Sequence, residues 1–392
     1  MNEKITRVKN GRIITGDEIT EGKFLYFSEN KILAVTSENL PCDTEIDACG
    51  NYVSPGFIDT HVHGGGGSDF MDGGTEPILN AAQFHLKHGT TTILPTTLAC
   101  SFDTLKIFLD DVNKVIKENM SDANTPGVHL EGPYFSHAQS GAQNPEYITP
   151  PNPDEYKEII GSYGDIIKKW SFAPELPGGE EFCEYIAENG VIPSAGHSDG
   201  TYDDMKRVHE KGCRHVTHLY SGMSTITRHM GYRKLGIIES AYCFDDVYAE
   251  LIADGKHLPP ELMQMIIKLK GAPHVCLVTD AMRGAGQESG ESYLGRKGEE
   301  MPCVIEDGVA KLTDRSAFAG SVATADRLVR TIVRETETSL TDAVKMITEV
   351  PAEICGLDTK GRLKENYDAD IIIFDENINI KNVISKGKII KE

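Results

Sequence analysis

Between residues 55 and 280, short β-branched and apolar runs alternate with longer stretches in which apolar residues recur at helical spacing. This alternation predicts an α/β fold in which each parallel strand is followed by a helix, the pattern of a TIM-type (β/α)8 barrel. The runs that fit strands are Phe57–His63, Thr91–Thr96, Gly127–Glu131, Lys168–Ala173, Val191–Ala195, His215–His218, Tyr248–Ala253 and Val275–Thr279.

The two ends of the chain have a different pattern, in which short β-segments are separated by turn residues. These segments are Ile5–Lys9, Arg12–Thr15, Phe24–Phe27, Lys31–Thr36 and Thr44–Asp47 at the start, with Asp370–Phe374 and Asn382–Ile390 at the end. Neither end can bury a core alone, so we expect both to pair into one small β-sandwich. The predicted domains are therefore a barrel of residues 55–356 and a sandwich made of residues 1–54 and 357–392.

Composition limits the classes of partner. The 392 residues include no run near the about 20 apolar residues that a membrane helix needs. Residues 1–9 lack the apolar core of a secretory signal peptide. The nine cysteines include no Cys-x-x-Cys pair, which fits reduced thiols. We therefore expect a cytoplasmic protein. A net charge of -21 would repel nucleic acid, and a small anionic substrate would need a local cationic pocket.

Ligand-type side chains stand where the predicted strands end, which is where barrels place their active sites. They are His61, His63, Glu131, His197, His218 and Asp280. The period of two along a strand points both histidines of the first pair the same way, which suits chelation. Four imidazoles and two carboxylates suit zinc or a similar divalent metal, such as iron, manganese or cobalt, with room for an activated water.

Seven segments, in order along the chain, carry a family resemblance. They are Pro55–Gly64, His129–Pro133, Ala195–Ser198, Thr217–Tyr220, Ile252–His257, Thr279–Met282 and Ala319–Ser321. Over nearly its whole length the chain resembles the N-acetylglucosamine-6-phosphate deacetylases of the amidohydrolase superfamily. The resemblance implies hydrolysis of N-acetyl-D-glucosamine 6-phosphate to D-glucosamine 6-phosphate and acetate, a step of amino-sugar catabolism.

The same resemblance implies roles for single residues. Glu131, His197 and His218 would hold the principal metal, while His61 and His63 would help to hold a second metal in members that keep both. Asp280 would be the catalytic acid and base. The implied substrate contacts are Ala142, Gln143, Ser221, Gly222, Arg233, His257, Phe318, Ala319 and Gly320.

Some of these contact positions differ from the family pattern. Several relatives have His where Gln143 stands, Ser221–Gly222 replaces Asn-Ala, and Phe318 replaces Leu. These changes leave the preferred sugar open. In the family, the arginine that matches Arg233 reaches the phosphate in the neighbouring subunit, which implies a homodimer with this residue acting in trans.

Three alternative functions remain. One is an N-acetylgalactosamine-6-phosphate deacetylase. Another is a cyclic-amide hydrolase, which would need a carboxylated lysine at the end of the fourth strand, whereas Lys168 and Lys169 lie at its start and Glu131 offers the bridge. The third is a non-catalytic scaffold, which the complete ligand set disfavours.

Overall fold

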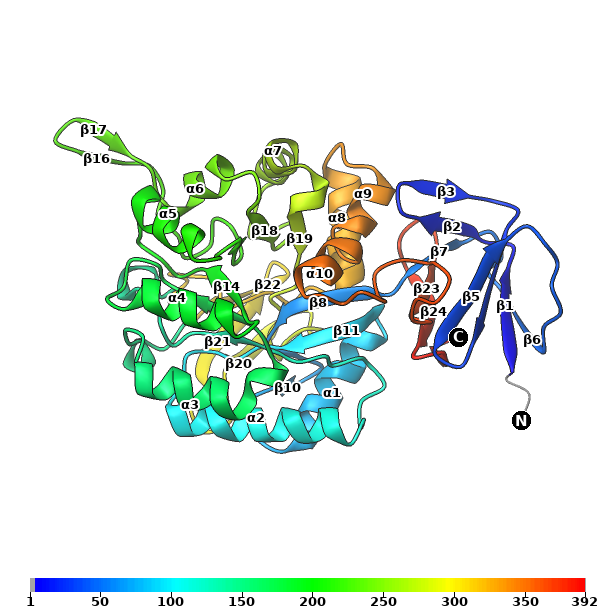
Figure 1. The fold of residues 1–392 in the computed structure, drawn as a ribbon, viewed down its shortest axis with the longest axis horizontal. Helices are drawn as coiled ribbons and strands as arrows, with labels where there is room; N and C mark the ends of the chain where they lie inside the picture. Colours follow the sequence, from blue (N-terminus) through cyan, green and yellow to red (C-terminus); the bar gives the residue numbers. More distant parts are fainter. Residues whose placement is uncertain (1–3, 392) are drawn as a thin grey trace.

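The computed structural model describes residues 4–391. Residues 1–3, which belong to the segment 1–9 considered above as a signal peptide, and residue 392 lie outside the described range. The chain folds into a larger α/β unit and a smaller group of β-strands at one end (Figure 1). Both the N-terminal and the C-terminal strands lie in the smaller group.

All eight predicted strands of the α/β unit are present in the described chain. They are β8 (Phe57–Val62), β11 (Thr90–Pro95), β12 (Val128–Glu131), β13 (Ile167–Phe172), β14 (Ile192–Ala195), β15 (His215–Val216), β18 (Tyr248–Leu251) and β19 (Val275–Leu277). Within residues 4–391, β12-β13-β14-β15-β18-β19 form a six-stranded sheet and β11-β8 a parallel pair. All of their pairings are parallel, which confirms the α/β fold.

Backbone hydrogen bonds and bridges link these two sheets on both sides. Thr96, just after β11, forms a parallel bridge with His129 of β12. On the other side, the Asp280 amide donates to the His61 carbonyl at 2.9 Å, and the His63 amide donates to the Ala281 carbonyl at 2.8 Å. The end of β8 is therefore tied to the segment that follows β19.

Several strands end earlier than their apolar runs predict. The predicted strand His215–His218 is only the two-residue β15, because His218 has a φ of 24°, which no strand residue adopts. The last strand ends at Leu277, and Asp280 beyond it has a φ of 47°. The chain therefore turns at His218 and at Asp280 rather than continuing as a strand.

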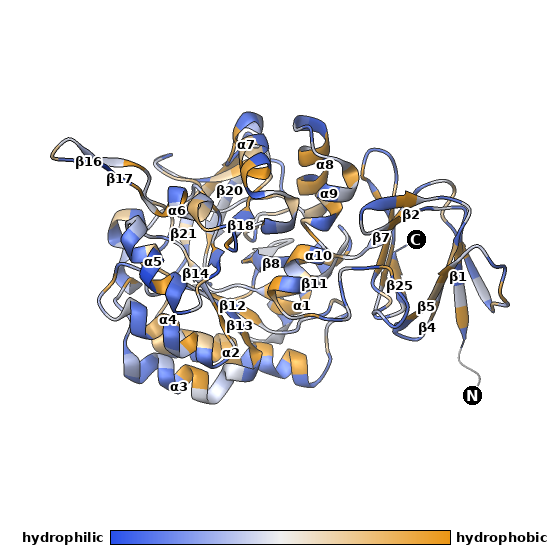
Figure 2. Cartoon of the chain, turned by 45° about the horizontal axis from the view of Figure 1, so that its top comes forward, coloured by the Kyte–Doolittle hydropathy of each residue, from blue (hydrophilic) through white to orange (hydrophobic). Residues whose placement is uncertain are grey.

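Helices follow the strands and cover the sheets. They are α1 (Thr75–Leu86), α2 (Phe102–Lys117), α3 (Pro153–Tyr163), α4 (Gly179–Glu188), α5 (Tyr202–Glu210), α6 (Ile237–Cys243), α7 (Pro260–Lys270), α8 (Ala325–Glu335), α9 (Leu340–Lys345) and α10 (Glu349–Ile354). α2 begins where the Ser101 hydroxyl accepts the Thr104 amide, and its buried residues include Phe108, Leu109 and Val112 at helical spacing. Figure 2 shows the resulting apolar and polar bands on α2 and α3.

The terminal strands form two further sheets. One has the order β5-β4-β1-β6 and the other β25-β24-β23-β7-β2-β3 in the described chain. Their bounds are β1 Ile5–Lys9, β2 Arg12–Thr15, β3 Glu18–Thr20, β4 Phe24–Ser28, β5 Lys31–Thr36, β6 Thr44–Asp47, β7 Tyr52–Pro55, β23 Ile371–Phe374, β24 Ile380–Ser385 and β25 Lys388–Lys391. Val8 and Leu25 of the first sheet share one buried cluster with Val53 and Ile371 of the second.

One prediction for the C-terminal end was wrong. The run Asn382–Ile390 is not one strand but the pair β24 and β25, joined by a turn. Lys386 and Gly387 in this turn have φ values of 51° and 70°, which interrupt an extended chain. β24 buries Val383 and Ile384, whereas β25 has no fully buried residue and leaves Ile389 exposed.

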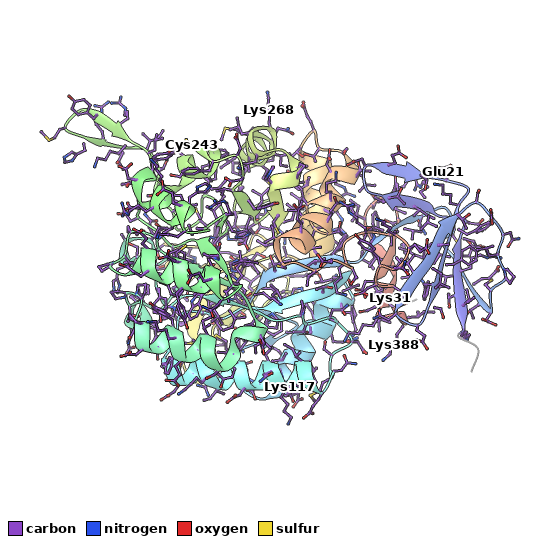
Figure 3. The ribbon with its side chains drawn as sticks, in the orientation of Figure 1. Glu21, Lys31, Lys117, Cys243, Lys268 and Lys388 are labelled. Carbon is purple, nitrogen blue, oxygen red and sulfur yellow. The ribbon has the colours of Figure 1, made fainter. Side chains whose placement is uncertain are left out.

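Short insertions complete the chain. They are β9 Gly64–Gly65, β10 Ser68–Asp69, β16 Thr227–His229, β17 Tyr232–Lys234, β20 Gly290–Leu294, β21 Met301–Glu306, β22 Val309–Leu312 and the 3-10 turns His137–Gln139, Pro145–Tyr147, Gly164–Ile166 and Ala272–His274. The hairpin β16–β17 projects away from the α/β unit (Figure 1), and its side chains extend into open space (Figure 3). Among the described helices, none is long and apolar enough to cross a membrane.

Candidate active site

The six predicted metal ligands meet at the ends of the parallel strands. All of them are at most 8% exposed, although they come from five separate strand ends. His61 lies within β8 and His63 directly after it, and Glu131 is the last residue of β12. His197, His218 and Asp280 follow β14, β15 and β19 by two or three residues.

The Glu131 carboxylate lies at the centre of the group. Its Oε1 is 3.0 Å from Nε2 of His218, 3.2 Å from Nε2 of His197 and 3.4 Å from Nε2 of His61. Its Oε2 is 3.5 Å from Nε2 of His63. Since all four imidazole nitrogens face one carboxylate, a single small ion could reach several of them together.

Asp280 lies beside the first-strand histidines. Its Oδ1 is 3.0 Å from Nε2 of His63 and 3.6 Å from Nε2 of His61. The ligand atoms form two groups of three, and the atoms of each group lie within 4.8 Å of one another. One group is His61, His63 and Asp280, and the other is His61, Glu131 and His218. His61 belongs to both groups.

The donor set fits a divalent metal. Nε2 of His61 is buried and makes no hydrogen bond to any residue in the described range, although it faces two carboxylates. A buried nitrogen in this state usually has a partner. Imidazole nitrogens with carboxylate oxygens are the ligands that zinc and similar metals use in catalytic sites. The structure therefore contains a possible His/Asp metal site.

The electrostatics of the group favour a bound cation. Burial alone would raise the pKa of Glu131, but the facing histidines hold it well below its usual range. Burial alone would lower the pKa of His61, but the charges of Glu131 and Glu250 raise it to about 10. The carboxylates thus create a negative field that a divalent cation would neutralise.

The backbone turns that aim the ligands are strained. His197, His218 and Asp280 have φ values of 50°, 24° and 47°. A residue with a Cβ adopts such a left-handed conformation at a cost of about 1–2 kcal/mol. Strain of this kind gathers at functional sites because the surrounding packing enforces it.

A cavity of about 300 Å³ opens over the ligand group. Five of the six ligands reach it, while the sixth, His61, is fully buried beneath. Of the substrate contacts implied by the resemblance, the following line the cavity: Ala142, Gln143, Ser221, Gly222, His257, Phe318 and Gly320. The remaining lining residues, which the resemblance did not imply as substrate contacts, are Leu98, Gly141, Tyr220, Leu294 and Ala317.

Two implied contacts lie elsewhere. Ala319 is fully buried and is not part of the cavity wall formed by residues 4–391. Arg233 lies in β17 on the projecting hairpin, where it is exposed and its Nη1 donates to the Gly231 carbonyl at 3.1 Å. Within a single chain, Arg233 is therefore not brought to the cavity.

Gln143 is tied to a metal ligand. Its Nε2 donates to Oε2 of Glu131 at 2.6 Å, and its Oε1 accepts the Ala99 amide at 2.7 Å. The backbone amide fixes the direction of the side-chain amide, because only oxygen can accept from it. Gln143 thus orients the carboxylate as well as lining the cavity.

The sequence did not point to Glu250, and it gave Lys169 no role at the site. Both side chains are fully buried, and Nζ of Lys169 donates to Oε1 of Glu250. Oε2 of Glu250 accepts from Nδ1 of His61 at 3.0 Å. The available signal was a single acidic residue inside the apolar run Tyr248–Ala253, paired with a lysine inside another predicted strand.

Comparison with known proteins gives a consistent result. The model of the amidohydrolase family matches residues 52–390. The chain is 36% identical over 349 residues to N-acetylglucosamine-6-phosphate deacetylase of Lysinibacillus sphaericus, covering 88% of this chain and 87% of the relative. It is 28% identical over 380 residues to N-acetylgalactosamine-6-phosphate deacetylase of Escherichia coli O157:H7, covering 96% and 97%.

Solved structures extend the similarity to three dimensions. One is a mutant N-acetyl-D-glucosamine-6-phosphate deacetylase from Mycobacterium smegmatis in complex with N-acetyl-D-glucosamine-6-phosphate, with a TM-score of 0.90, 25% identity and full coverage of both chains. Another is N-acetylglucosamine-6-phosphate deacetylase from Thermotoga maritima, with a TM-score of 0.86 and 31% identity, covering 98% of this chain and 99% of that one.

Proposed function

Because this chain belongs to the amidohydrolase family, we propose that it hydrolyses the N-acetyl group of N-acetyl-D-glucosamine 6-phosphate. The products are D-glucosamine 6-phosphate and acetate, and the reaction belongs to amino-sugar catabolism. The observation that carries the proposal is the meeting of four histidines, Glu131 and Asp280 at the floor of a cavity of about 300 Å³. This volume is at the lower end of the range that holds a small ligand.

The chain's own groups account for the proton transfers. An amide is a poor electrophile, and a divalent ion held by Glu131, His197 and His218 would polarise the acetyl carbonyl and lower the pKa of a water from about 15.7 towards about 7. Asp280 accepts a proton from the attacking water and returns it to the departing amine nitrogen. His63, 3.0 Å from Oδ1, fixes the position of this carboxylate.

We further propose that the metal is zinc, in one or two copies per chain, with iron, manganese or cobalt as competitors. Mixed nitrogen and oxygen donors support zinc. His61 and His63 support a second ion, because together with Asp280 they form a ligand group next to that of Glu131 and His218.

The architecture that we propose is a closed (β/α)8 barrel of residues 55–356 with a β-sandwich of residues 1–54 and 357–392. The links of β11 to β12, and of β8 to the segment after β19, support closure. The buried cluster shared by the two terminal sheets supports the sandwich. A barrel places its active site at the carboxyl ends of the strands, where the cavity lies.

A homodimer would supply the missing phosphate contact. In a protein with a net charge of -21, a phosphate needs a local cation, and an arginine can meet it through two parallel hydrogen bonds. His257 lies at the cavity, but Arg233 is carried outward by its hairpin. We propose that Arg233 enters the cavity of the neighbouring subunit. The cytoplasmic location stays a prediction.

N-acetylgalactosamine 6-phosphate is the second candidate substrate. The similarity to a relative with that activity supports it. The cavity residues Gln143, Ser221 and Phe318, which differ from the family pattern, leave the choice of sugar open. A cyclic-amide hydrolase is disfavoured, because Lys169 forms a buried ion pair with Glu250 and the carboxylate that faces the histidines is Glu131. The complete ligand set likewise disfavours a non-catalytic scaffold.

The test is acetate release from a panel of N-acetylated sugars by zinc-loaded protein. The panel holds the glucosamine and galactosamine epimers, each with and without the 6-phosphate. The fastest release is expected from N-acetyl-D-glucosamine 6-phosphate, and removal of the metal with a chelator should abolish it. Failure of the metal-loaded protein to act on either phosphorylated sugar would contradict the proposed function.

A further inference from the structure

A buried ion pair lies next to the metal ligands and has no part in the chemistry proposed above. Lys169 comes from β13 and Glu250 from β18, and neither side chain is exposed to solvent. The two strands are not adjacent in the sheet, since β14 and β15 lie between them. The pair therefore spans the space enclosed by the sheet rather than joining neighbouring strands.

Glu250 contacts two of the proposed ligands. Its Oε2 accepts from Nδ1 of His61 at 3.0 Å and from the backbone amide of His218 at 3.1 Å. A carboxylate at Nδ1 keeps the proton on that nitrogen, which leaves the lone pair of Nε2 free for a metal. The acceptor also restrains rotation of the imidazole ring.

His61 is the ligand for which orientation has most effect. It belongs to both groups of potential ligand atoms, one with His63 and Asp280 and the other with Glu131 and His218. Its Nε2 lies 3.4 Å from Oε1 of Glu131 and 3.6 Å from Oδ1 of Asp280. Because Nε2 has a single lone pair, it can bind one ion at a time, and a rotated ring would leave the group with His63 and Asp280 incomplete.

Stability alone does not account for the pair. Barrel interiors are usually filled by bulky branched side chains, and replacing a buried ion pair by apolar residues of similar size is often neutral or stabilising. A lone buried carboxylate, in contrast, would be strongly unfavourable. Lys169 is thus explained as the counter-charge that lets Glu250 remain a buried acceptor for His61.

We infer that Glu250, balanced by Lys169, is a positioning residue that directs the single Nε2 lone pair of His61 toward the metal position formed with His63 and Asp280. This inference rests on the proposed metal-dependent deacetylase. It assigns no contact with substrate to either residue. What it requires is a hydrogen-bond acceptor at residue 250, rather than the charge itself.

Two double variants separate the acceptor from the ion pair. Glu250→Gln with Lys169→Met and Glu250→Met with Lys169→Met both remove the buried charges and keep similar volume. Only the first keeps an acceptor for Nδ1 of His61. Zinc affinity and the zinc-to-protein ratio are measured by competition with a chelator on full-length protein, after far-UV circular dichroism has shown that each variant is folded.

The wild-type chain is expected to bind two zinc ions. The Gln variant should also bind two, with a zinc affinity within a few-fold of that of wild type. The Met variant should lose one ion, or bind it about 10- to 100-fold more weakly, as when other outer partners of metal-bound histidines are removed. If the Met variant does not fold, Glu250→Leu with Lys169→Met replaces it. Equal zinc binding in the Gln and apolar variants, or a single zinc in wild type, overturns the inference.

Acetate release by wild type separates this inference from the proposed function. An active wild type whose double variants bind zinc equally would reject only the role of Glu250. A wild type that releases no acetate from N-acetyl-D-glucosamine 6-phosphate, while its double variants differ in zinc binding, would reject only the proposed function.

Discussion

Asp280 is the residue on which the proposed proton transfers depend. It lines the cavity, is 8% exposed, and stands 3.0 Å from Nε2 of His63. Asp280→Asn keeps the size of the side chain but cannot accept and return a proton, so kcat should fall about 100- to 10,000-fold. Zinc held by Glu131, His197 and His218 should remain. Steady-state kinetics with metal analysis checks both points, and substantial activity in this variant would exclude the acid/base role.

His197 and His218 should affect metal content and activity together. Each lies about 3 Å from Oε1 of Glu131, in a site of only a few protein ligands. His197→Ala or His218→Ala should therefore lower the zinc-to-protein ratio and remove most activity. Replacing the exposed His137 by Ala is the matched control and should change neither. Full zinc occupancy in either ligand variant would refute the assignment of the principal metal position.

At the scale of elements, helix α1 is linked to the turn after β8 through His85. This histidine is fully buried, and one of its ring nitrogens, Nε2, lies 2.9 Å from the carbonyl of Gly64. Burial is the main cause that lowers its pKa to about 4. Because an unfolded histidine has a pKa of about 6.5, the unfolded chain binds the proton more readily between these values. Stability from this residue is complete above about pH 6.5 and is lost as pH falls towards about 4.

The expected cost of acidification through this range is about 3 kcal/mol for His85. His85→Gln can still donate to the Gly64 carbonyl but does not titrate, so the unfolding temperature of this variant should fall less between pH 7 and pH 4.5 than that of wild type. Thermal unfolding in the presence of a chelator checks this without a contribution from metal release. The control His137→Gln, at an exposed position, should show the same dependence of unfolding temperature on pH as wild type. If His85→Gln also showed the wild-type dependence, His85 would not contribute to the loss of stability in acid.

At the scale of the whole molecule, the phosphate has to bind against a net charge of -21. Arg233, on a hairpin that projects from the chain (Figure 1), is proposed to offset this field in a neighbouring subunit. A contact remote from the acetyl group acts equally in the ground and transition states. Arg233→Ala should therefore mainly raise KM for the phosphorylated sugar, with little effect on an unphosphorylated one.

Subunit mixing tests the trans arrangement. In a hybrid of Arg233→Ala and Asp280→Asn subunits, one cavity has both an intact Asp280 and the intact Arg233 of the other chain. Activity at low substrate should therefore recover when the two variants exchange subunits. No recovery after confirmed exchange, or a monomer in solution, would reject the arrangement.

The sequence by itself determined the eight parallel strands and the residues that end them. Hydrophobic periodicity is a local property, and the rule that parallel strands present their carboxyl ends to one side brings distant ligands together without knowledge of packing. His61, His63, Glu131, His197, His218 and Asp280 could thus be grouped before any distance was known. The left-handed turns at His218 and Asp280, which shorten the strands, carried no such local signal.

Only the tertiary structure decided which side chains support these ligands. Gln143 and Glu250 contact ligands from other strands, and Lys169 meets Glu250 across two intervening strands. Such contacts depend on the register and curvature of the whole sheet, which no window of sequence contains. The outward course of the hairpin that carries Arg233 is likewise visible only in the structure. A hydrogen bond needs its two partners within about 3 Å, and only the assembled fold fixes positions that finely.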